Sequence, residues 1–182
     1  MLPNRKSIRL KGYDYSNAGM YFLTFCCQNR KHFFGKIVNK ELQLNGAGKM
    51  IAKWYLELEN KFPDVTCGEF VVMPNHFHCI IIKNEIPVGV DLRVDPSDDI
   101  ANGNNIEGEH KGSLLHLVVG WFKTMTTNEY IRGVKTLNWE RFEGKLWQRN
   151  YWEHIIRNEK SFHKISEYIK NNPVNWDSDS LK

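Results

Sequence analysis

The sequence lacks long apolar runs, clustered cysteines and a strong excess of one charge. No window of its 182 residues approaches the roughly 20 consecutive apolar residues that a membrane span needs. The basic residues near its start are not followed by an apolar stretch either, so we expect a cytoplasmic protein without a membrane partner. The four cysteines form neither a zinc-binding spacing nor a disulfide framework. We expect small buried side chains at these positions, which are Cys26, Cys27, Cys67 and Cys79.

The net charge is only +4, but it is unevenly distributed. Residues 84–112 hold seven acidic and two basic residues, so the rest of the chain has 23 basic and 14 acidic residues, a net charge of +9. Such a basic body attracts nucleic acid. Residues 84–112 are also rich in glycine and show no periodicity. We therefore predict one domain spanning residues 1–182, with a flexible acidic insertion at 84–112.

Hydrophobic periodicity predicts an α+β fold. Runs rich in aromatic and β-branched residues indicate strands, and apolar residues spaced three and four apart indicate helices. The expected strands cover 21–28, 69–73, 76–83 and 147–156, with a hairpin-like stretch around Ile37 and Leu44. The expected helices cover 46–61, a segment that Ser113 caps, and 158–171, which Pro173 ends. This order predicts a ferredoxin-like (split βαβ) antiparallel sheet with helices on one face and an added C-terminal helix.

Two histidines share one face of the strand expected at 76–83. Because side chains of a strand alternate between its faces, His76 and His78 point the same way, while Phe77 points toward the expected core. Two imidazoles about 7 Å apart along a strand can share one metal ion. A His-x-His pair alone is more often two strand histidines without a role, so this pattern needs a second observation.

The last expected helix supplies that observation. Its apolar stripe is formed by Phe162, Ile165 and Ile169. Helical spacing places Tyr168 beside this stripe and Asn172 one turn further on the same face. A tyrosine hydroxyl and a side-chain amide would therefore both approach the sheet. The alternative is that Tyr168 packs at the edge of the helix interface and Asn172 caps the helix.

Basic and aromatic residues elsewhere are candidates for contacts with nucleic acid. Aromatic rings suit stacking on unpaired bases, and cationic side chains suit phosphates, although aromatic residues in a strand more often belong to the core. The candidates are Arg5, Lys6, Arg9 and Lys11 in the N-terminal arm, Lys123 and Lys164 in the later helices, and Trp147, Arg149, Tyr151 and Trp152 near the last strand.

Taken together, these stretches resemble the single-tyrosine HUH transposases, named for two histidines around a hydrophobic residue, and within them the REP-associated tyrosine transposases. The resemblance spans nearly the whole chain apart from the insertion at 84–112. Its most specific parts are the Met-Pro-Asn-His-Phe-His run and the Tyr-Ile-x-x-Asn-Pro helix. The matching stretches are Gly12–Ser16, Phe70–His78, Trp147–Tyr151, Glu153–Arg157 and Tyr168–Pro173.

The resemblance implies an enzyme that cleaves and rejoins single-stranded DNA, usually beside small hairpin-forming repeats, as a monomer or a homodimer. It implies that His76 and His78 bind a metal ion, that Asn172 is a polar metal ligand, and that Tyr168 is the nucleophile. Tyr168 would keep the 5′ phosphate and leave a 3′ hydroxyl. Nitrogen and amide oxygen ligands with open positions suit Mg²⁺ or Mn²⁺. The cation would also help a tyrosine whose unperturbed pKa is about 10.

Two other functions remain open at this point. The first is a non-catalytic module with a ferredoxin-like fold that binds single-stranded nucleic acid. The aromatic-rich sheet motif of RNA-recognition domains is absent, which argues against it. The second is a metal-dependent hydrolase that uses water as its nucleophile, in which Tyr168→Phe would be nearly harmless.

Overall fold

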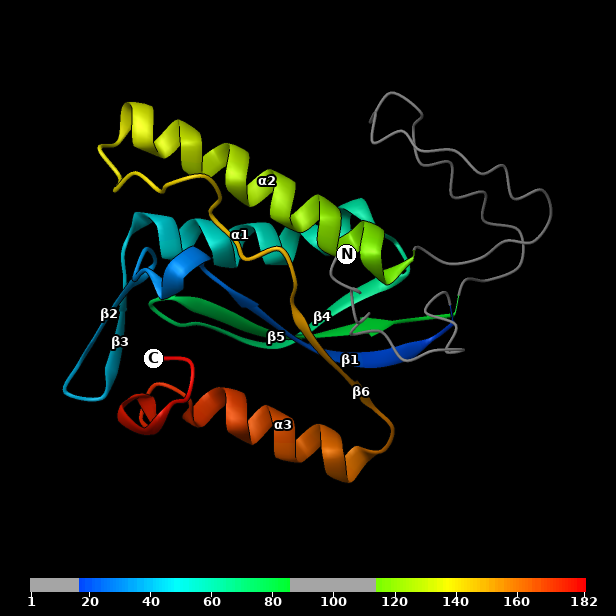
Figure 1. Ribbon diagram of the computed structural model, residues 1–182. Coiled ribbons are helices and arrows are strands. Elements are labelled where there is room, and N and C mark those ends of the chain that lie inside the picture. Colours follow the sequence, from blue (N-terminus) through cyan, green and yellow to red (C-terminus); the bar gives the residue numbers. More distant parts are fainter. Residues whose placement is uncertain (1–16, 86–113) are drawn as a thin grey trace, which may run out of the picture.

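The computed structural model describes residues 17–85 and 114–182 (Figure 1). The predictions for Arg5, Lys6, Arg9 and Lys11, and those for most of the insertion, lie outside the described residues. Within the described part, no helix combines the length and the apolar composition needed to cross a membrane.

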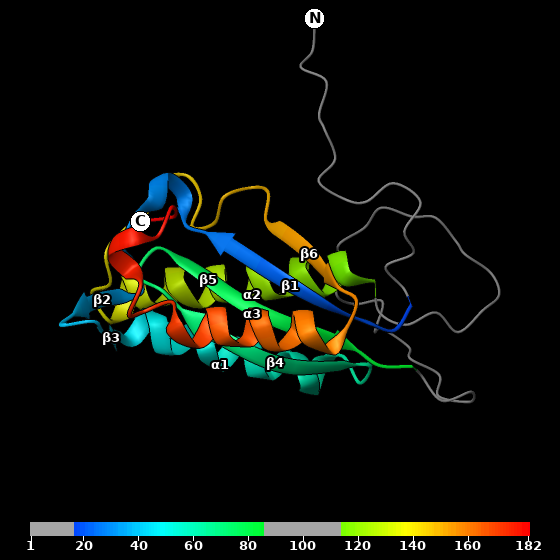
Figure 2. The ribbon, with the colours of Figure 1, turned by 90° about the horizontal axis from the view of Figure 1, so that it is seen from below.

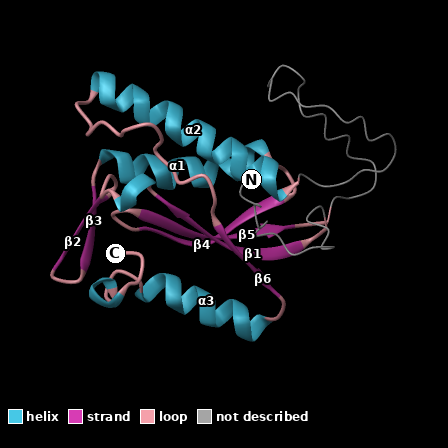
Figure 3. Ribbon diagram, viewed as in Figure 1, coloured by secondary structure: helices cyan, strands magenta, loops and turns pink. Residues whose placement is uncertain are grey.

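The main sheet has four antiparallel strands in the order β4-β5-β1-β6. Helices α1 and α2 cover one face of this sheet, and α3 lies on the opposite face (Figures 1 and 3). This is the predicted ferredoxin-like plan with its added C-terminal helix. The strands are β1 (Gly19–Cys26), β4 (Val65–Val72), β5 (His76–Lys83) and β6 (Trp152–Ile156), and the helices are α1 (Gly46–Lys61), α2 (Leu115–Thr136) and α3 (Glu159–Asn171).

Shorter elements complete the described chain. The predicted hairpin around Ile37 and Leu44 is present as β2 (Gly35–Val38) and β3 (Glu41–Leu44), which pair with each other outside the main sheet. Two 3₁₀ turns follow β1 and α3, namely η1 (Gln28–Arg30) and η2 (Trp176–Ser178).

Asparagine side chains start two of the helices. Asn45 accepts a hydrogen bond from the Gly48 amide at 2.9 Å, and Asn158 accepts one from the Ser161 amide at 2.9 Å. These bonds satisfy amides of the first turn that have no partner within the helix. The N-cap of α2 is Leu114, which makes no side-chain capping bond, and Ser113, the predicted cap, lies outside the described residues.

Two strands differ in length from the prediction. β4 starts at Val65 rather than residue 69, because a bulge between Cys67 and Phe70 interrupts the alternation by which the sequence marks a strand. β6 starts at Trp152 rather than residue 147. Trp147 forms only an isolated bridge with Cys27, and the chain between Trp147 and β6 is irregular.

Alternation along β5 divides the interior into two parts. Phe77 and Cys79 face α1 and α2 and join a large aromatic and aliphatic cluster. Ile80 belongs to a smaller cluster under α3 that includes Ile169. The predicted burial of the cysteines is confirmed for three of them: Cys26, Cys27 and Cys79 are buried, and Cys67 is half-buried. The histidines of β5 therefore face the smaller cluster and α3.

Candidate active site

The two histidines of β5 are buried side by side under α3. His76 is 0% and His78 2% exposed, and their ring centroids lie 4.6 Å apart. Both are placed by the turn at Pro74 and Asn75, after which β5 runs back along β4. Their shared orientation confirms the alternation argument. Two imidazoles so far from solvent need partners, because a buried polar group without a hydrogen bond costs free energy.

Asn75 fixes the tautomer of His76. The amide nitrogen of Asn75 donates to the Leu181 carbonyl at 2.8 Å, so its oxygen is the atom that faces His76. This oxygen lies 2.7 Å from His76 Nδ1 and can only accept, so Nδ1 carries the proton. The second ring nitrogen, Nε2, keeps its lone pair. A neutral imidazole with one nitrogen held in this way is the form that binds a metal ion.

Thr24 on the neighbouring strand β1 orients His78. Its hydroxyl lies 2.7 Å from His78 Nδ1. The His78 ring also stacks on Phe22, with centroids 5.3 Å apart. With Nδ1 held by Thr24, Nε2 of His78 faces α3. There it lies 3.4 Å from the hydroxyl of Tyr168.

Helix α3 brings Tyr168 over the histidines while leaving it accessible. Ile169 anchors the helix to the sheet, and the edge of the Tyr168 ring meets Phe22 at 6.1 Å. Tyr168 is nevertheless 47% exposed, so its hydroxyl touches the buried site and remains reachable from solvent. Burial and then the nearby Asp179 carboxylate raise the pKa of Tyr168, and its contact with the Asn172 amide partly opposes this. The hydroxyl is therefore protonated at neutral pH and needs a positive charge to become a good nucleophile.

Asn172 ends helix α3, and its side chain also lies at the buried centre. It is the C-cap of α3, and its side chain is buried, with 3% of the residue exposed. Its amide lies close enough to His76 and Tyr168 to change the pKa of each. The structure thus brings together the four residues predicted for the centre.

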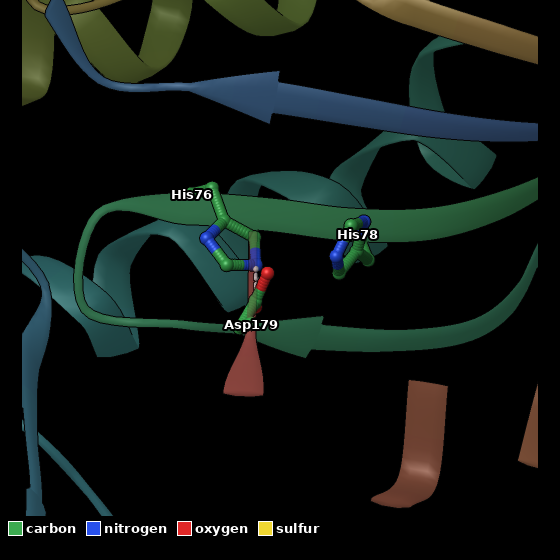
Figure 4. A group of neighbouring side chains, drawn as sticks. All are labelled: His76, His78 and Asp179. Atoms are coloured by element: carbon green, nitrogen blue, oxygen red, sulfur yellow. Dashed lines mark ion pairs between the residues drawn. The ribbon is translucent and has the colours of Figure 1, made fainter. Parts of the chain in front are cut away.

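A fifth residue, Asp179, was missed by the sequence analysis. The chain turns back after α3 and η2, which places this carboxylate beside the histidines (Figure 4). Its Oδ2 lies 3.5 Å from His76 Nε2, and its Oδ1 accepts a hydrogen bond from the Leu181 amide at 2.7 Å. Trp176 supports this turn by stacking on His76, with centroids 6.1 Å apart. Asp179 belongs to no periodic pattern, so only the folded chain shows where it lies.

The groups at this centre fit a divalent cation. Ligand atoms of His76, His78 and Asp179 lie within 4.8 Å of one another. At this centre, three buried side-chain atoms make no hydrogen bond: His76 Nε2, Asp179 Oδ2 and Asn172 Oδ1. All three present electron pairs and none presents a proton, which is unfavourable unless a cation lies among them. Two imidazoles, a carboxylate and an amide oxygen are ligands that Mn²⁺ and Mg²⁺ accept.

The electrostatics of the histidines agree with this arrangement. Burial lowers the pKa of His76 to about 4, although the Asp179 carboxylate acts in the opposite direction. Burial, together with the neighbouring His76, lowers the pKa of His78 well below its usual value. Both rings are therefore neutral at physiological pH, which is the protonation state that a metal ligand requires.

The predicted nucleic-acid contacts lie in different environments. Trp147 is 5% exposed and donates from Nε1 to the Thr126 hydroxyl at 3.0 Å, so it has little free ring surface for a base. Tyr151 packs on Phe25, with ring centroids 5.5 Å apart. Lys123 donates to the carbonyls of residues 148 and 149. Its ammonium group also lies over the rings of Phe25 and Tyr151, at 5.7 Å from each ring centroid. Burial lowers the pKa of Lys123 to about 8.

Arg149 and Lys164 are both exposed. Arg149 lines a groove of about 430 Å³ between α2 and residues 142–149. Lys164 lies one turn before Tyr168 on α3, so its side chain is near the edge of the candidate site. Both remain predictions for contacts with nucleic acid, as do Lys123, Trp147 and Tyr151.

Comparison with known proteins gives three findings of different weight. No known family profile matches the sequence. A Haemophilus influenzae protein without a characterised function is 38% identical over 99% of this chain and 94% of its own length, so the two belong to one family. A second H. influenzae protein, provisionally named a REP-associated tyrosine transposase, is 24% identical over 88% of this chain and 73% of its own length.

A solved structure extends the comparison to the fold. The REP-associated tyrosine transposase bound to a REP hairpin superposes with a TM-score of 0.58 and 18% identity, covering 94% of this chain and 74% of that one. At this identity the likeness concerns the fold alone. Together with the sequence relative, it confirms the resemblance that the motifs predicted.

Proposed function

We propose that this chain, which belongs to a transposase-like family related to the REP-associated tyrosine transposases, cleaves and rejoins single-stranded DNA through Tyr168. The substrate is single-stranded DNA beside hairpin-forming repeats, because the solved neighbour is bound to a REP hairpin. The reaction depends on a divalent cation, Mg²⁺ or Mn²⁺. The protein is thus an enzyme and not only a nucleic-acid-binding module.

One observation supports this proposal above the others. The hydroxyl of Tyr168 is 3.4 Å from Nε2 of a histidine whose other nitrogen is held by Thr24, and Tyr168 as a residue is 47% exposed. A module that only binds DNA has no need for a tyrosine hydroxyl at a buried His-His-Asp centre. A hydrolase that uses water has no need for the tyrosine.

In the proposed reaction, one phosphorus–oxygen bond forms for each one that breaks. Tyr168 Oη attacks phosphorus, an O–P bond forms to the tyrosine, and the bond from phosphorus to the 3′ oxygen breaks. The tyrosine proton is lost and the 3′ oxygen gains one, which leaves a 5′-phosphotyrosine and a free 3′ hydroxyl. Attack by a 3′ hydroxyl on the phosphotyrosine reverses the step and joins two DNA ends without ATP.

The residues around Tyr168 divide the work. His76, His78, Asp179 and the oxygen of Asn172 would hold the cation. When bound there, a divalent cation neutralises charge on nonbridging phosphate oxygens and favours the phenolate. Asn75 keeps His76 in the tautomer that leaves Nε2 free for a cation, and Thr24 orients the ring of His78. Packing of α3 keeps the hydroxyl within reach of the site, which lowers the entropic cost of attack.

The test is a covalent adduct. The wild-type protein is incubated with Mn²⁺ and a labelled single-stranded oligonucleotide that carries a hairpin, and the products are run on a denaturing gel. A protein band shifted by DNA is expected. Tyr168→Phe removes one oxygen and little packing, so it should keep the fold and DNA binding while the adduct and strand cleavage disappear.

Tyr151→Phe is the matched control, because it removes the same atom from a tyrosine that packs on Phe25, in the cluster on the other face of the sheet. It should keep adduct formation. An adduct that persists in Tyr168→Phe and is lost in Tyr151→Phe would move the nucleophile to Tyr151. Cleavage without any adduct would favour the hydrolase, and binding without cleavage would favour the non-catalytic module.

A further inference from the structure

Trp152 is the most exposed of the large apolar side chains in the described residues. Its exposed fraction is 67%, compared with 64% for Leu137, the next in order. A single exposed apolar side chain needs no explanation by itself. The position of Trp152 distinguishes it, because it opens the edge strand β6 immediately beside the candidate active site.

Strand register places Trp152 in one row with the catalytic centre. Thr24 of β1 pairs with His78 on one side and with Trp152 on the other. Residues directly opposite each other on antiparallel strands share a face of the sheet. Since Thr24 bonds to His78, the face of this row is the one under α3. Neighbouring strands are about 4.8 Å apart, so the Cα of Trp152 lies about 10 Å from that of His78, roughly the span of a dinucleotide.

Helix α3 does not cover this end of the row. It packs mainly on β4, with smaller contacts to β5 and β6. Figure 2 shows α3 running along β4 and β5, with β6 to one side. Ile156, at the far end of β6, is buried in the cluster under α3, whereas Trp152 at its start is exposed. The indole is therefore open to solvent on the same face as Tyr168.

The neighbouring aromatic candidates are committed to the protein interior. Trp147 lies 5.2 Å from Phe34 and 6.1 Å from Phe25, measured between ring centroids, and is 5% exposed. Tyr151 packs on Phe25 and under Lys123. Of the three aromatic candidates in this segment, Trp147 and Tyr151 therefore pack in the core, and Trp152 is exposed.

We propose that Trp152 is a positioning residue that stacks on an unpaired base next to the phosphodiester attacked by Tyr168. The inference rests on the proposed function for the identity of the reaction, but stacking can be tested by binding alone. An exposed indole on the same face of the sheet as the nucleophile accepts any unpaired base and rejects a paired one. Trp152 therefore contributes selectivity for single strands rather than for sequence.

The test compares two probes of equal length, an oligothymidine strand and an abasic strand with the same number of phosphates. Binding is measured by fluorescence anisotropy in the Tyr168→Phe background, so that no cleavage occurs. Trp152→Ala should weaken binding of oligothymidine about tenfold or more while binding of the abasic strand stays unchanged. Trp152→Phe keeps an aromatic face and should restore most of the loss. Leu56→Ala truncates a side chain of α1 that is 52% exposed and should change neither affinity.

The outcomes separate this inference from the proposed function. If Trp152→Ala weakens both probes equally, or neither, the stacking role is wrong whatever Tyr168 does. If the wild type forms no adduct but the loss specific to oligothymidine is present, the catalytic proposal fails and the stacking site stands. With Tyr168 restored, Trp152→Ala should raise the KM for adduct formation more than it lowers kcat. An effect on kcat alone would overturn the positioning role.

Discussion

The two faces of the sheet bury different chemistry. The face under α1 and α2 buries a large cluster of aromatic and aliphatic side chains, centred on Phe25, Phe77 and Phe122. The face under α3 has a smaller apolar cluster and buries the imidazoles of His76 and His78 beside it. One strand, β5, contributes to both faces by alternation. Adjacent residues of β5 therefore face different clusters, so substitutions on the two faces should have separable effects.

The largest expected effect concerns activity on the α3 face. His76→Ala should lower DNA cleavage in Mn²⁺ or Mg²⁺ by at least about 100-fold while single-stranded DNA still binds, because the lost charge neutralisation acts in the transition state. A gel-based cleavage assay measures the first quantity and anisotropy the second. Mn²⁺ should raise the melting temperature of the wild type and not that of the variant.

His163→Ala is the control for this prediction. His163 lies on the same helix as Tyr168, but its side chain is 68% exposed and its Nε2 lies 3.4 Å from Glu159 Oε1. Its removal should leave cleavage and the Mn²⁺ effect unchanged. Full cleavage by a His76→Ala, His78→Ala double variant would show that the imidazoles hold no catalytic ion.

The second effect concerns stability on the opposite face. Phe77 is 0% exposed and its ring meets those of Phe25, Tyr55 and Phe122 at 5.4–6.1 Å. Phe77→Ala should lower the free energy of unfolding by about 3–5 kcal/mol, through lost burial and a cavity. His78→Ala, measured with EDTA present, loses the bond to Thr24 and the stacking on Phe22, and should cost about 1–3 kcal/mol. Urea denaturation measures both values. Equal losses would contradict the division of stability between the two faces.

Much of this comparison could be predicted from the sequence. Alternation assigned His76 and His78 to one face and Phe77 to the other, and helical spacing directed Tyr168 and Asn172 toward the sheet. Local patterns suffice for these residues because each lies in a regular strand or helix, and the period of that element determines the face on which the side chain lies. The element order likewise gave the ferredoxin-like plan, since that order admits few sheets with short connections.

The rest depends on contacts between distant segments. Asp179 reaches the histidines through a turn without periodicity, and its partner His76 becomes a neighbour only in the folded chain. Trp147 and Trp152 have similar surroundings in the sequence, yet one is buried and the other exposed. Their difference arises because regular pairing begins at Trp152, and no local propensity marks that boundary.

The smallest expected effect comes from the acidic insertion, which lies apart from both faces in the sequence. Replacing residues 88–109 with a short Gly/Ser linker should change the free energy of unfolding by less than about 1 kcal/mol, because closure entropy varies slowly with loop length. The same urea titration used for Phe77→Ala measures this. If the shortened protein fails to fold, the insertion is required for the stability of the folded sheet and helices.

Removal of the insertion also deletes an acidic segment from a chain whose remainder has a net charge of +9. Nonspecific DNA binding should therefore tighten at low salt, and the gain should vanish as salt screens the charges.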